Sequence, residues 1–301
     1  MRVCFALLLT SVLCASALRR RSLSGSGAAA AAFVGLATAS NDNVLFTAVL
    51  LAFYVTSTFW TRHQAQLKAK LDPAFAKESR RDWRQVLCNG GVGALLSLVY
   101  QWHFDGRRPE DLSAAERWLM TVLVWAYVAF YACCAADTWA SEVGSLSSNW
   151  PVLITTLQLV PPGTNGGVSK LGLLSSFAGG AAVGLAADVA QWAQYSSALR
   201  AGVLPRLPYI MAGSMFGVLG SALDSLLGAT VQASYLVGKR ATSDLSPADR
   251  ARLGGVKVIC GRDLLSNNMV NAVASTCTTA AAVGLLSLLG LLSRRGGPEP
   301  R

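Results

Sequence analysis

Two acidic side chains stand inside otherwise apolar stretches of this sequence. Asp137 ends an apolar run within residues 135–144, and Asp224 lies deep in residues 220–230, which are rich in small side chains. A charged side chain at the centre of a membrane helix costs about 2.5 kcal/mol or more, so such residues usually mark functional sites. No Lys or Arg lies in the apolar stretch around Asp224, so a salt bridge within that stretch does not explain it.

The residues around Asp137 predict a site for a divalent cation. In a continuous helix, Asp137 and Ser141 lie one turn apart on one face. Thr138 and Glu142 form the neighbouring pair. Magnesium prefers hard oxygen ligands and usually keeps water and substrate phosphates in its shell. We therefore expect Asp137, Glu142 and Asp224 to hold Mg²⁺, with Asp137 and Asp224 as the catalytic residues; the alternative is a helix end with solvated acids.

The two acids share a local pattern. Asp137-Thr138 and Asp224-Ser225 each join an acid to a hydroxyl, with a small residue one turn further on. The pattern hints at an internal duplication, an arrangement that places binding sites between repeats in membrane transporters. Asp188 also lies in an apolar stretch, but no hydroxyl or glycine motif surrounds it, and we expect a structural or lumenal residue.

Residues 161–167 predict a phosphate-binding loop. Two prolines form a rigid turn and flexible glycines follow, which leaves backbone N–H groups free to cradle phosphate at the start of the next helix. The Gly-Lys-Ser/Thr ending of a Walker loop is absent, and a plain turn between helices is the alternative. The predicted phosphate- or nucleotide-binding residues are Gly163, Thr164, Asn165, Gly166, Gly167 and Lys257.

Further polar residues gather on the predicted face of this site. Asparagines open two of the apolar spans, where they act as helix caps or as partners of the acids. The expected supporting residues are Thr138, Ser141, Ser225, Asn89, Asn268 and Asn271, with Asn267 beside them. Basic loop residues on this face suit phosphate or, equally, anionic lipid head groups. They are Lys239, Arg240, Lys257 and Arg262.

The elements that position these residues must be membrane helices. Of the 301 residues, 52% are hydrophobic and 14% are charged, whereas about a quarter of the residues in soluble domains are charged. The mean hydropathy is +0.42, and continuous rather than alternating apolar runs argue against a barrel. A soluble globular enzyme, a disordered chain and a disulfide scaffold are excluded. We expect an all-α polytopic membrane protein with about seven transmembrane helices, some of them Gly-rich and broken.

Composition divides the chain into three parts. Residues 1–26 form a short membrane helix or a targeting leader with a basic stop, since apolar residues 3–18 precede three arginines. Residues 27–293 form the polytopic membrane domain, and residues 294–301 form a polar tail. A cleavable signal peptide and a plastid leader both fit the first part, but we expect it to stay in place.

The distribution of basic residues predicts the orientation in the membrane. The net charge is +10, from 26 Lys and Arg against 16 Asp and Glu. Counting spans places residues 19–21, 61–84, 137–170 and 238–266 on one face, which then carries 17 of the 26 basic residues. By the positive-inside rule this face is cytoplasmic, or stromal in a plastid. Without a basic stripe interleaved with aromatics, we expect no nucleic-acid partner.

At these motifs the sequence resembles the integral membrane family that contains transmembrane protein 19 and the plant phytyl-phosphate kinase of tocopherol synthesis. The overall layout is most similar to the transmembrane protein 19 branch. Ala136 departs from the family pattern, which often has Gly there, and the far N-terminus is short. The matching stretches are residues 21–23 with 26–28, 56–72, 81–83 with 86–90, 136–144, 162–168, 220–232 and 267–271.

The resemblance implies a kinase-like phosphoryl transfer from CTP or ATP to an isoprenoid or phytyl monophosphate, the reaction of the plant branch. The motifs are also similar in style to those of CTP-dependent lipid kinases. Such transfer depends mainly on positioning and charge neutralisation, so the lack of a catalytic His is no objection. We expect the lipid tail between the Gly-rich spans, and the protein in the lipid bilayer of an ER-like endomembrane or of the plastid envelope. The alternative is a non-catalytic protein or transporter that binds an ion or an anionic lipid; the oligomeric state is left open.

Overall fold

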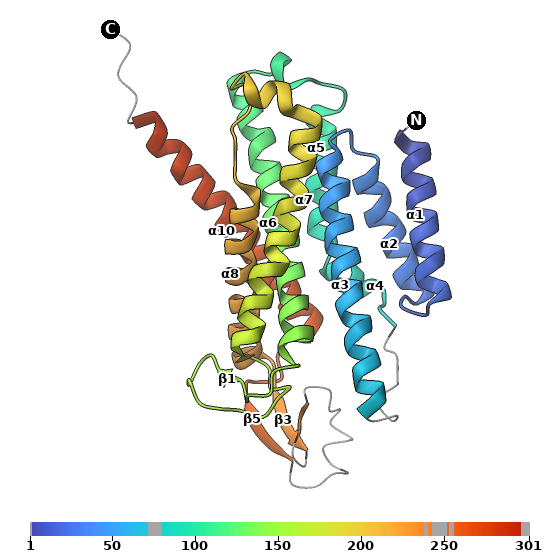
Figure 1. Ribbon diagram of the computed structural model, residues 1–301, viewed down its shortest axis with the longest axis vertical. Coiled ribbons are helices and arrows are strands. Elements are labelled where there is room, and N and C mark those ends of the chain that lie inside the picture. The colour runs from blue at the N-terminus through green and yellow to red at the C-terminus, as the bar shows by residue number, and fades with distance from the viewer. Residues whose placement is uncertain (1, 72–79, 238–239, 243–251, 253–255, 296–301) are drawn as a thin grey trace.

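The computed structural model describes residues 2–71, 80–237, 240–242, 252 and 256–295. It is a long bundle of helices with short strands at one end (Figure 1). The elements in chain order are α1 (Arg2–Arg19), α2 (Gly25–Ala39), α3 (Val44–Leu71), α4 (Trp83–Cys88), α5 (Gly91–Phe104), η2 (Pro109–Asp111), α6 (Ala114–Gly144), β1 (Val152–Leu153), β2 (Gly167–Val168), α7 (Lys170–Arg200), α8 (Tyr209–Val231), β3 (Ser234–Val237), β4 (Arg240–Thr242), β5 (Lys257–Cys260) and α10 (Asn267–Arg295).

Six of the described helices are long and apolar enough to cross a membrane: α1, α3, α6, α7, α8 and α10. The shorter apolar helix α2 and the pair α4–α5 run beside them (Figure 1). The all-α polytopic fold is therefore confirmed, with a span count close to the expected seven. The stretch expected to form one apolar span near residue 90 is broken between α4 and α5, at Asn89 and Gly90. Lys239 and residues 296–301 of the predicted tail lie outside the described residues.

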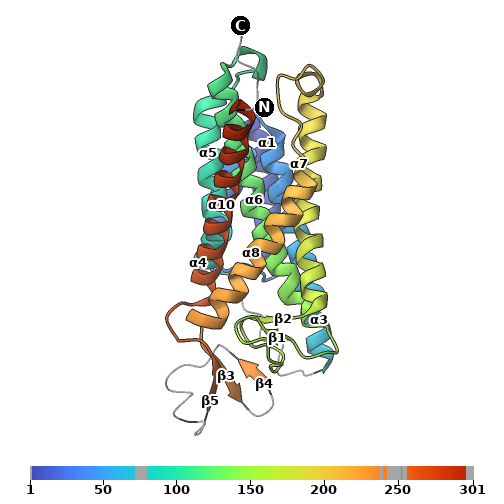
Figure 2. The same ribbon diagram turned by 90° about the vertical axis from the view of Figure 1, so that its left-hand side faces the viewer.

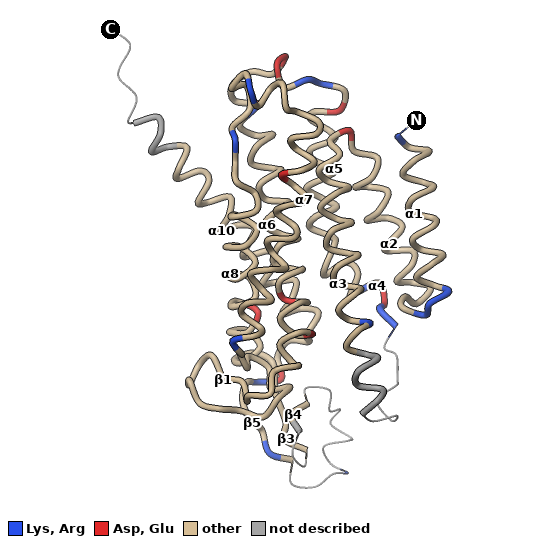
Figure 3. Tube along the Cα trace, viewed as in Figure 1, with Lys and Arg blue, Asp and Glu red and all other residues tan. Residues whose placement is uncertain are grey.

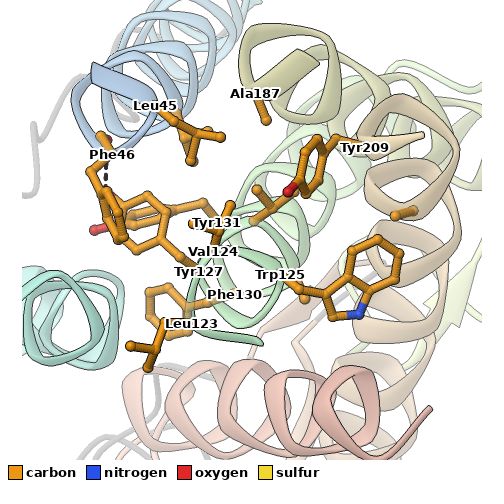
Figure 4. Close-up of a cluster of buried hydrophobic side chains, with 14 of the residues drawn as sticks. Leu45, Phe46, Leu123, Val124, Trp125, Tyr127, Phe130, Tyr131, Ala187 and Tyr209 are labelled. Atoms are coloured by element: carbon orange, nitrogen blue, oxygen red, sulfur yellow. Dashed lines mark hydrogen bonds between the residues drawn. The ribbon is translucent and has the colours of Figure 1, made fainter. Parts of the chain in front are cut away.

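Helix α6 forms the centre of the bundle. Of its apolar stretch 89% is buried inside the protein, compared with 44% for α7 and 17% for α1. Aromatic side chains of α6 point outward and form hydrogen bonds to neighbouring helices (Figure 4). The Tyr127 hydroxyl donates to the Phe46 carbonyl oxygen at 2.8 Å. The Trp125 indole N–H donates to the Ala282 carbonyl oxygen at 3.0 Å. A helix packed on all sides has a fixed position, so Asp137, two turns before its end, is held firmly.

Helices α7 and α8 pack backbone to backbone through their glycines. A Cβ atom added at Gly180 would lie 2.1 Å from the Gly213 carbonyl oxygen, and one at Gly184 would lie 2.1 Å from the Tyr209 carbonyl oxygen. Small residues here permit close contact between the helices. The prediction that a lipid tail lies between the Gly-rich spans is therefore wrong at this contact, because the two backbones fill the space themselves.

Asp188 caps helix α8 from the neighbouring helix α7. Its two carboxylate oxygens accept hydrogen bonds from the backbone N–H groups of Tyr209 (3.1 Å) and Ile210 (2.9 Å). Pro208, which precedes α8, supplies no side-chain cap. The carboxylate thus satisfies the first N–H groups of α8 and lies at the positive end of its dipole. The structural role expected for Asp188 is confirmed.

The connections that carry the predicted phosphate loop and basic residues lie at one end of the bundle, the lower end in Figure 1, which we call the loop end. There β1 pairs with β2, and β3 pairs with both β4 and β5, all antiparallel. Figure 2 shows the sheet of β3, β4 and β5 beyond the ends of the helices. Helices α1 and α3 both run toward this end, as the count of spans predicted, and α1 stops short of the level that α3 reaches (Figure 1). Lys and Arg gather toward the two ends of the bundle (Figure 3), and the membrane side that each end faces stays a prediction.

Candidate functional site

A partly open cavity of about 970 Å³ extends along the bundle and reaches the loop end. This volume lies near the upper limit of ordinary ligand pockets, about 300–1,000 Å³. The wall comes from α1–α4, α6–α8, the start of α10 and the connection between α6 and α7. Most of the predicted site residues line it: Asn89, Asp137, Thr138, Ser141, Glu142, Gly163, Thr164, Asn165, Gly166, Gly167, Asp224, Ser225 and Asn271.

The cavity wall contains a pair of carboxyl groups. Asp137 of α6 and Asp224 of α8 lie within hydrogen-bonding reach of each other, and both are partly exposed to the cavity. With its amide nitrogen turned toward them, Asn271 donates to Asp224 Oδ2 (3.1 Å) and to the Asn267 carbonyl oxygen (2.9 Å). Two carboxylates this close repel each other unless a proton or a cation lies between them. Their hard oxygen atoms suit Mg²⁺, so the donor set fits the expected ion.

Glu142 lies apart from this pair. Within the described part of the chain no three His, Cys, Asp or Glu side chains come close enough to share a metal ion. Glu142 follows Asp137 by five residues on α6, which turns it toward a different part of the cavity wall, where its charge acts on Arg81. The structure thus brings together two of the three predicted metal ligands, whereas Glu142 lies apart from them and acts electrostatically on Arg81.

The hydroxyls predicted to support the acids bond to their own helix. Thr138 Oγ1 donates to the Cys134 carbonyl oxygen at 2.8 Å, and Ser141 Oγ donates to the Thr138 carbonyl oxygen at 3.0 Å. Both hydroxyl oxygens keep lone pairs that can accept hydrogen bonds from a ligand. They therefore act as acceptors on the cavity wall.

Arg81 is a cavity residue that sequence reasoning did not single out as a site residue. Its Nη2 donates to Thr61 Oγ1 at 3.3 Å, and its backbone bonds to the α1–α2 connection at Ser22 (3.1 Å) and Ser24 (3.0 Å). Burial lowers the pKa of Arg81, and the Glu142 carboxylate acts in the opposite direction. An arginine stays charged in either case, so the cavity holds a fixed positive charge. The signal in the sequence was its place in the matching stretch 81–83.

The glycine loop shapes the wall behind Asp224. Gly166 has a positive φ of 75°, and a Cβ atom there would lie 2.5 Å from the Ser225 carbonyl oxygen. Hydrogen bonds occupy three of the loop amides, those of Thr164, Asn165 and Gly167. The expected row of free N–H groups is therefore shorter than predicted, because these amides bond to Pro161, Ser234 and Thr164.

The N-terminus of α7 supplies a second feature that favours anions. The helix begins at Lys170, after Ser169, whose hydroxyl accepts from the Gly172 N–H at 3.0 Å. All three residues line the cavity. The positive end of a helix dipole attracts phosphate and carboxylate groups. Lys170 and the start of α7 therefore take the place that the sequence analysis gave to Lys257.

Two predicted residues lie away from the cavity. Lys257 is exposed on β5, beyond the helix ends, and is not part of the cavity wall. Asn268 follows Asn267 on α10, whereas Asn267 and Asn271 are one turn apart and line the cavity. Consecutive residues of a helix point in different directions, so only one of Asn267 and Asn268 can lie on the face of α10 toward the cavity. That residue is Asn267.

The fold and the site define a polytopic helical membrane protein with a carboxylate pair facing a partly open cavity. Residues 8–279 match the family described as Integral membrane protein DUF92, and the chain belongs to this family. The Arabidopsis thaliana Protein PGR is 35% identical over 279 residues, which cover 92% of this chain and 94% of that protein. No solved structure matches the chain.

Two other relatives are more distant. An uncharacterized membrane protein of Methanocaldococcus jannaschii is 24% identical over 230 residues, covering 76% of this chain and 82% of the relative. The Arabidopsis thaliana Protein VTE6, chloroplastic, is 29% identical over 159 residues, covering 52% of this chain and 45% of the relative. The match across nearly the whole chain is therefore with Protein PGR, and that with Protein VTE6 covers about half.

Proposed function

We propose that this protein transfers a phosphoryl group from a nucleoside triphosphate, CTP or ATP, to an isoprenoid monophosphate such as phytyl monophosphate. The observation that carries the proposal is the Asp137–Asp224 pair, which stands on two packed helices, contacts Asn271 of a third and faces a large cavity with cationic groups. Phosphoryl transfer needs two anionic substrates held in line and their charge neutralised. The cavity offers oxygen ligands for a metal and positive groups for phosphate within one wall.

The acidic and the basic residues of the cavity would have different roles in this reaction. Asp137 and Asp224 would hold Mg²⁺, which neutralises the charge on the transferring phosphoryl group. Asn271 orients the Asp224 carboxylate through its 3.1 Å hydrogen bond. Arg81 and Lys170, with the start of α7, would bind phosphate oxygens of the two substrates.

The resemblance to the plant phytyl-phosphate kinase supports this reaction, and the match with Protein VTE6, chloroplastic, is consistent with it over about half of the chain. The name of Protein PGR states no reaction, although the match covers nearly the whole chain. The word chloroplastic in the name of Protein VTE6 supports a plastid envelope location, beside the ER-like alternative.

The direct test uses purified protein in lipid nanodiscs. Phytyl and farnesyl monophosphates are offered with CTP and ATP that carry label in the γ-phosphate. We expect labelled isoprenoid diphosphate that forms only with Mg²⁺ present. Absence of labelled lipid with every pair of substrates, from protein that binds the lipid phosphates, would contradict the proposal.

The second candidate is a transporter or a non-catalytic binding protein. The observation that favours it is the carboxylate pair itself, since buried acids that share a proton or cation mark transport pathways in membrane proteins. In that case lipid phosphate or an ion binds without turnover of nucleotide. Proton or Mg²⁺ uptake into sealed vesicles, in the absence of any triphosphate, distinguishes this candidate from the kinase.

A further inference from the structure

The cavity changes character along its length. At the loop end its wall carries Arg81, Glu142 and Lys170. Away from that end the wall is mostly apolar, with the hydroxyls of Thr10, Thr47 and Ser57 between the apolar side chains, and three helices from the first part of the chain form it. The apolar side chains that matter here are Leu9 and Leu13 of α1, Val34 of α2, and Leu50, Leu51 and Phe53 of α3.

The apolar part is long enough for an extended chain. On α3 the lining residues run from Thr47, near the start of the helix, to Thr61, a length of helix that rises about 21 Å. Thr61 is the residue that accepts the hydrogen bond from Arg81 at 3.3 Å. A molecule that fills this space therefore has one end beside a fixed positive charge and the other deep among the helices.

The helices around this space pack mainly in two groups. α1 packs on α2, and α2 packs on α4 and α5, whereas α3 packs on α6 and α7; the contact between α2 and α3 is smaller. Figure 1 shows α1 and α2 as a pair beside α3. The pair itself is tight, since a Cβ atom at Gly35 would lie 2.9 Å from Thr10 Oγ1. The space is therefore between the pair and α3, both of which line it.

We propose that α1, α2 and α3 form the binding subsite for the single apolar tail of a lipid monophosphate, whose phosphate lies beside Arg81 and the Asp137–Asp224 pair. The identity of the lipid as a phosphoryl acceptor rests on the proposed function, whereas the placement of the tail rests on the cavity. An apolar cavity does not hold ordered water, so an apolar chain matches its wall. Arg81 and Lys170 match an anionic head group at the loop end.

Photolabelling tests the placement on the unaltered protein. The probe is phytyl monophosphate with a diazirine at the far end of its tail, bound to the full chain in nanodiscs. We expect labelled peptides from residues 2–19 and 44–58, and we expect unlabelled phytyl monophosphate to remove that label. Label that is removed by competition but falls on α7 and α8 overturns the subsite, as does the absence of any competable label.

A pair of tryptophan substitutions on α3 tests the length of the subsite. Thr47 lines the far end of the cavity, so Thr47→Trp shortens it, whereas Val55 is 56% exposed on the outside and Val55→Trp is the matched control. The indole of Thr47→Trp would occupy the space of the tail's far end and should therefore weaken binding of phytyl monophosphate about tenfold or more. Geranyl monophosphate, with a shorter chain, should bind to both variants as to wild type. Equal losses for both lipids, or for both variants, contradict the subsite.

The outcomes separate the two proposals. Competable label on α1–α3 without turnover of any nucleotide keeps the tail subsite and contradicts the kinase. Turnover with label elsewhere keeps the kinase and contradicts the subsite. Because photolabelling uses wild-type protein, misfolding of Thr47→Trp does not affect that result.

Discussion

Neutralising Asp224 separates a functional carboxylate from a structural one. Asp224→Asn keeps the size of the side chain and removes its charge. The carboxylate lies beside a second carboxylate, Asp137, and accepts one hydrogen bond from Asn271 at 3.1 Å. Removing a charge from a membrane helix relieves about 2.5–3.5 kcal/mol of insertion cost, and repulsion from Asp137 disappears as well. The free energy of unfolding should therefore stay the same or rise.

The activity should change in the opposite direction. A metal ion supplies several kcal/mol of transition-state stabilisation, and loss of about 3–4 kcal/mol slows a reaction about 100–1,000-fold. We therefore expect Asp137→Asn and Asp224→Asn each to reduce kcat at least about 100-fold while the protein stays folded. Initial rates of phosphoryl transfer and thermal unfolding are measured on the same nanodisc samples.

Asp188→Asn is the matched control, because it also removes one charge from a membrane helix. Asp188 caps α8 and lies outside the cavity wall. Asn keeps one of its two acceptor oxygens and loses the charge at the helix N-terminus, so Asp188→Asn should lower stability by about 0.5–2 kcal/mol and leave activity per folded molecule unchanged. Near wild-type activity in both site variants, or a profile equal to that of Asp188→Asn, would refute the assignment. If no turnover can be measured, Mg²⁺-dependent nucleotide binding is compared instead. Equal binding by wild type, Asp137→Asn and Asp224→Asn would also refute the assignment.

Three further predictions concern charge, loop geometry and topology. Arg81→Gln should raise the Kd for phytyl monophosphate about tenfold or more by removing a charged hydrogen-bond donor, measured by displacement of the photoprobe; an unchanged Kd contradicts its role. Gly166→Ala should lower the free energy of unfolding by about 2 kcal/mol, because φ is positive at Gly166 and α8 lies against it. The control is Gly284→Ala, whose added methyl group meets no neighbour within 4 Å and should leave the free energy of unfolding unchanged. Equal effects of both variants in thermal unfolding would contradict the close packing at Gly166. Single cysteines at Trp150 and Lys257, in a cysteine-free chain, should react with an impermeant reagent from the same side of sealed vesicles, and reaction from opposite sides contradicts the shared loop end.

Asp137 and Asp224 could be predicted as site residues from the sequence because the evidence for them lies in their immediate neighbours. Asp137 and Asp224 are conspicuous in apolar runs, and the physical cost of a charge in a membrane applies wherever those runs fold. Their pairing across α6 and α8, and the contact with Asn271, required the helices to be placed. The same limit explains Glu142, whose neighbour depends on where a distant segment of the chain passes α6.

Arg81 shows why part of the site could not be predicted from the residues alone. It follows a polar segment rich in Lys and Arg, which in a sequence indicates a solvated loop. Its burial results from backbone bonds to Ser22 and Ser24, nearly sixty residues earlier in the chain. The helix α2 comes close enough only because Gly27 has no Cβ, which would lie 2.2 Å from the Arg81 carbonyl oxygen.

The glycines of α7 and α8 pose the converse problem. A row of small residues permits close approach, but the sequence does not state whether a helix or a lipid makes the approach. Here the two helices contact each other, with Gly180 against Gly213, and the cavity lies nearer the loop end, where Ser176 of α7 and Ser221 of α8 line it. The close approach expected at these glycines is confirmed, and at the contact of Gly180 with Gly213 a helix makes it, so the lipid tail does not lie there.

The two walls of the cavity differ in a way that assigns them different tasks. The carboxylate pair belongs to α6 and α8, and its partner Asn271 belongs to α10; these three helices pack on one another around the aromatic core. A metal and a triphosphate need such fixed geometry, since small displacements of ligands cost large factors in rate. The apolar wall belongs to α1, α2 and α3, of which α1 lines the cavity through Leu9 and Leu13 and packs on α2. Changes in that wall should therefore alter which lipid is accepted, while Mg²⁺-dependent nucleotide binding at the carboxylate pair stays as in wild type.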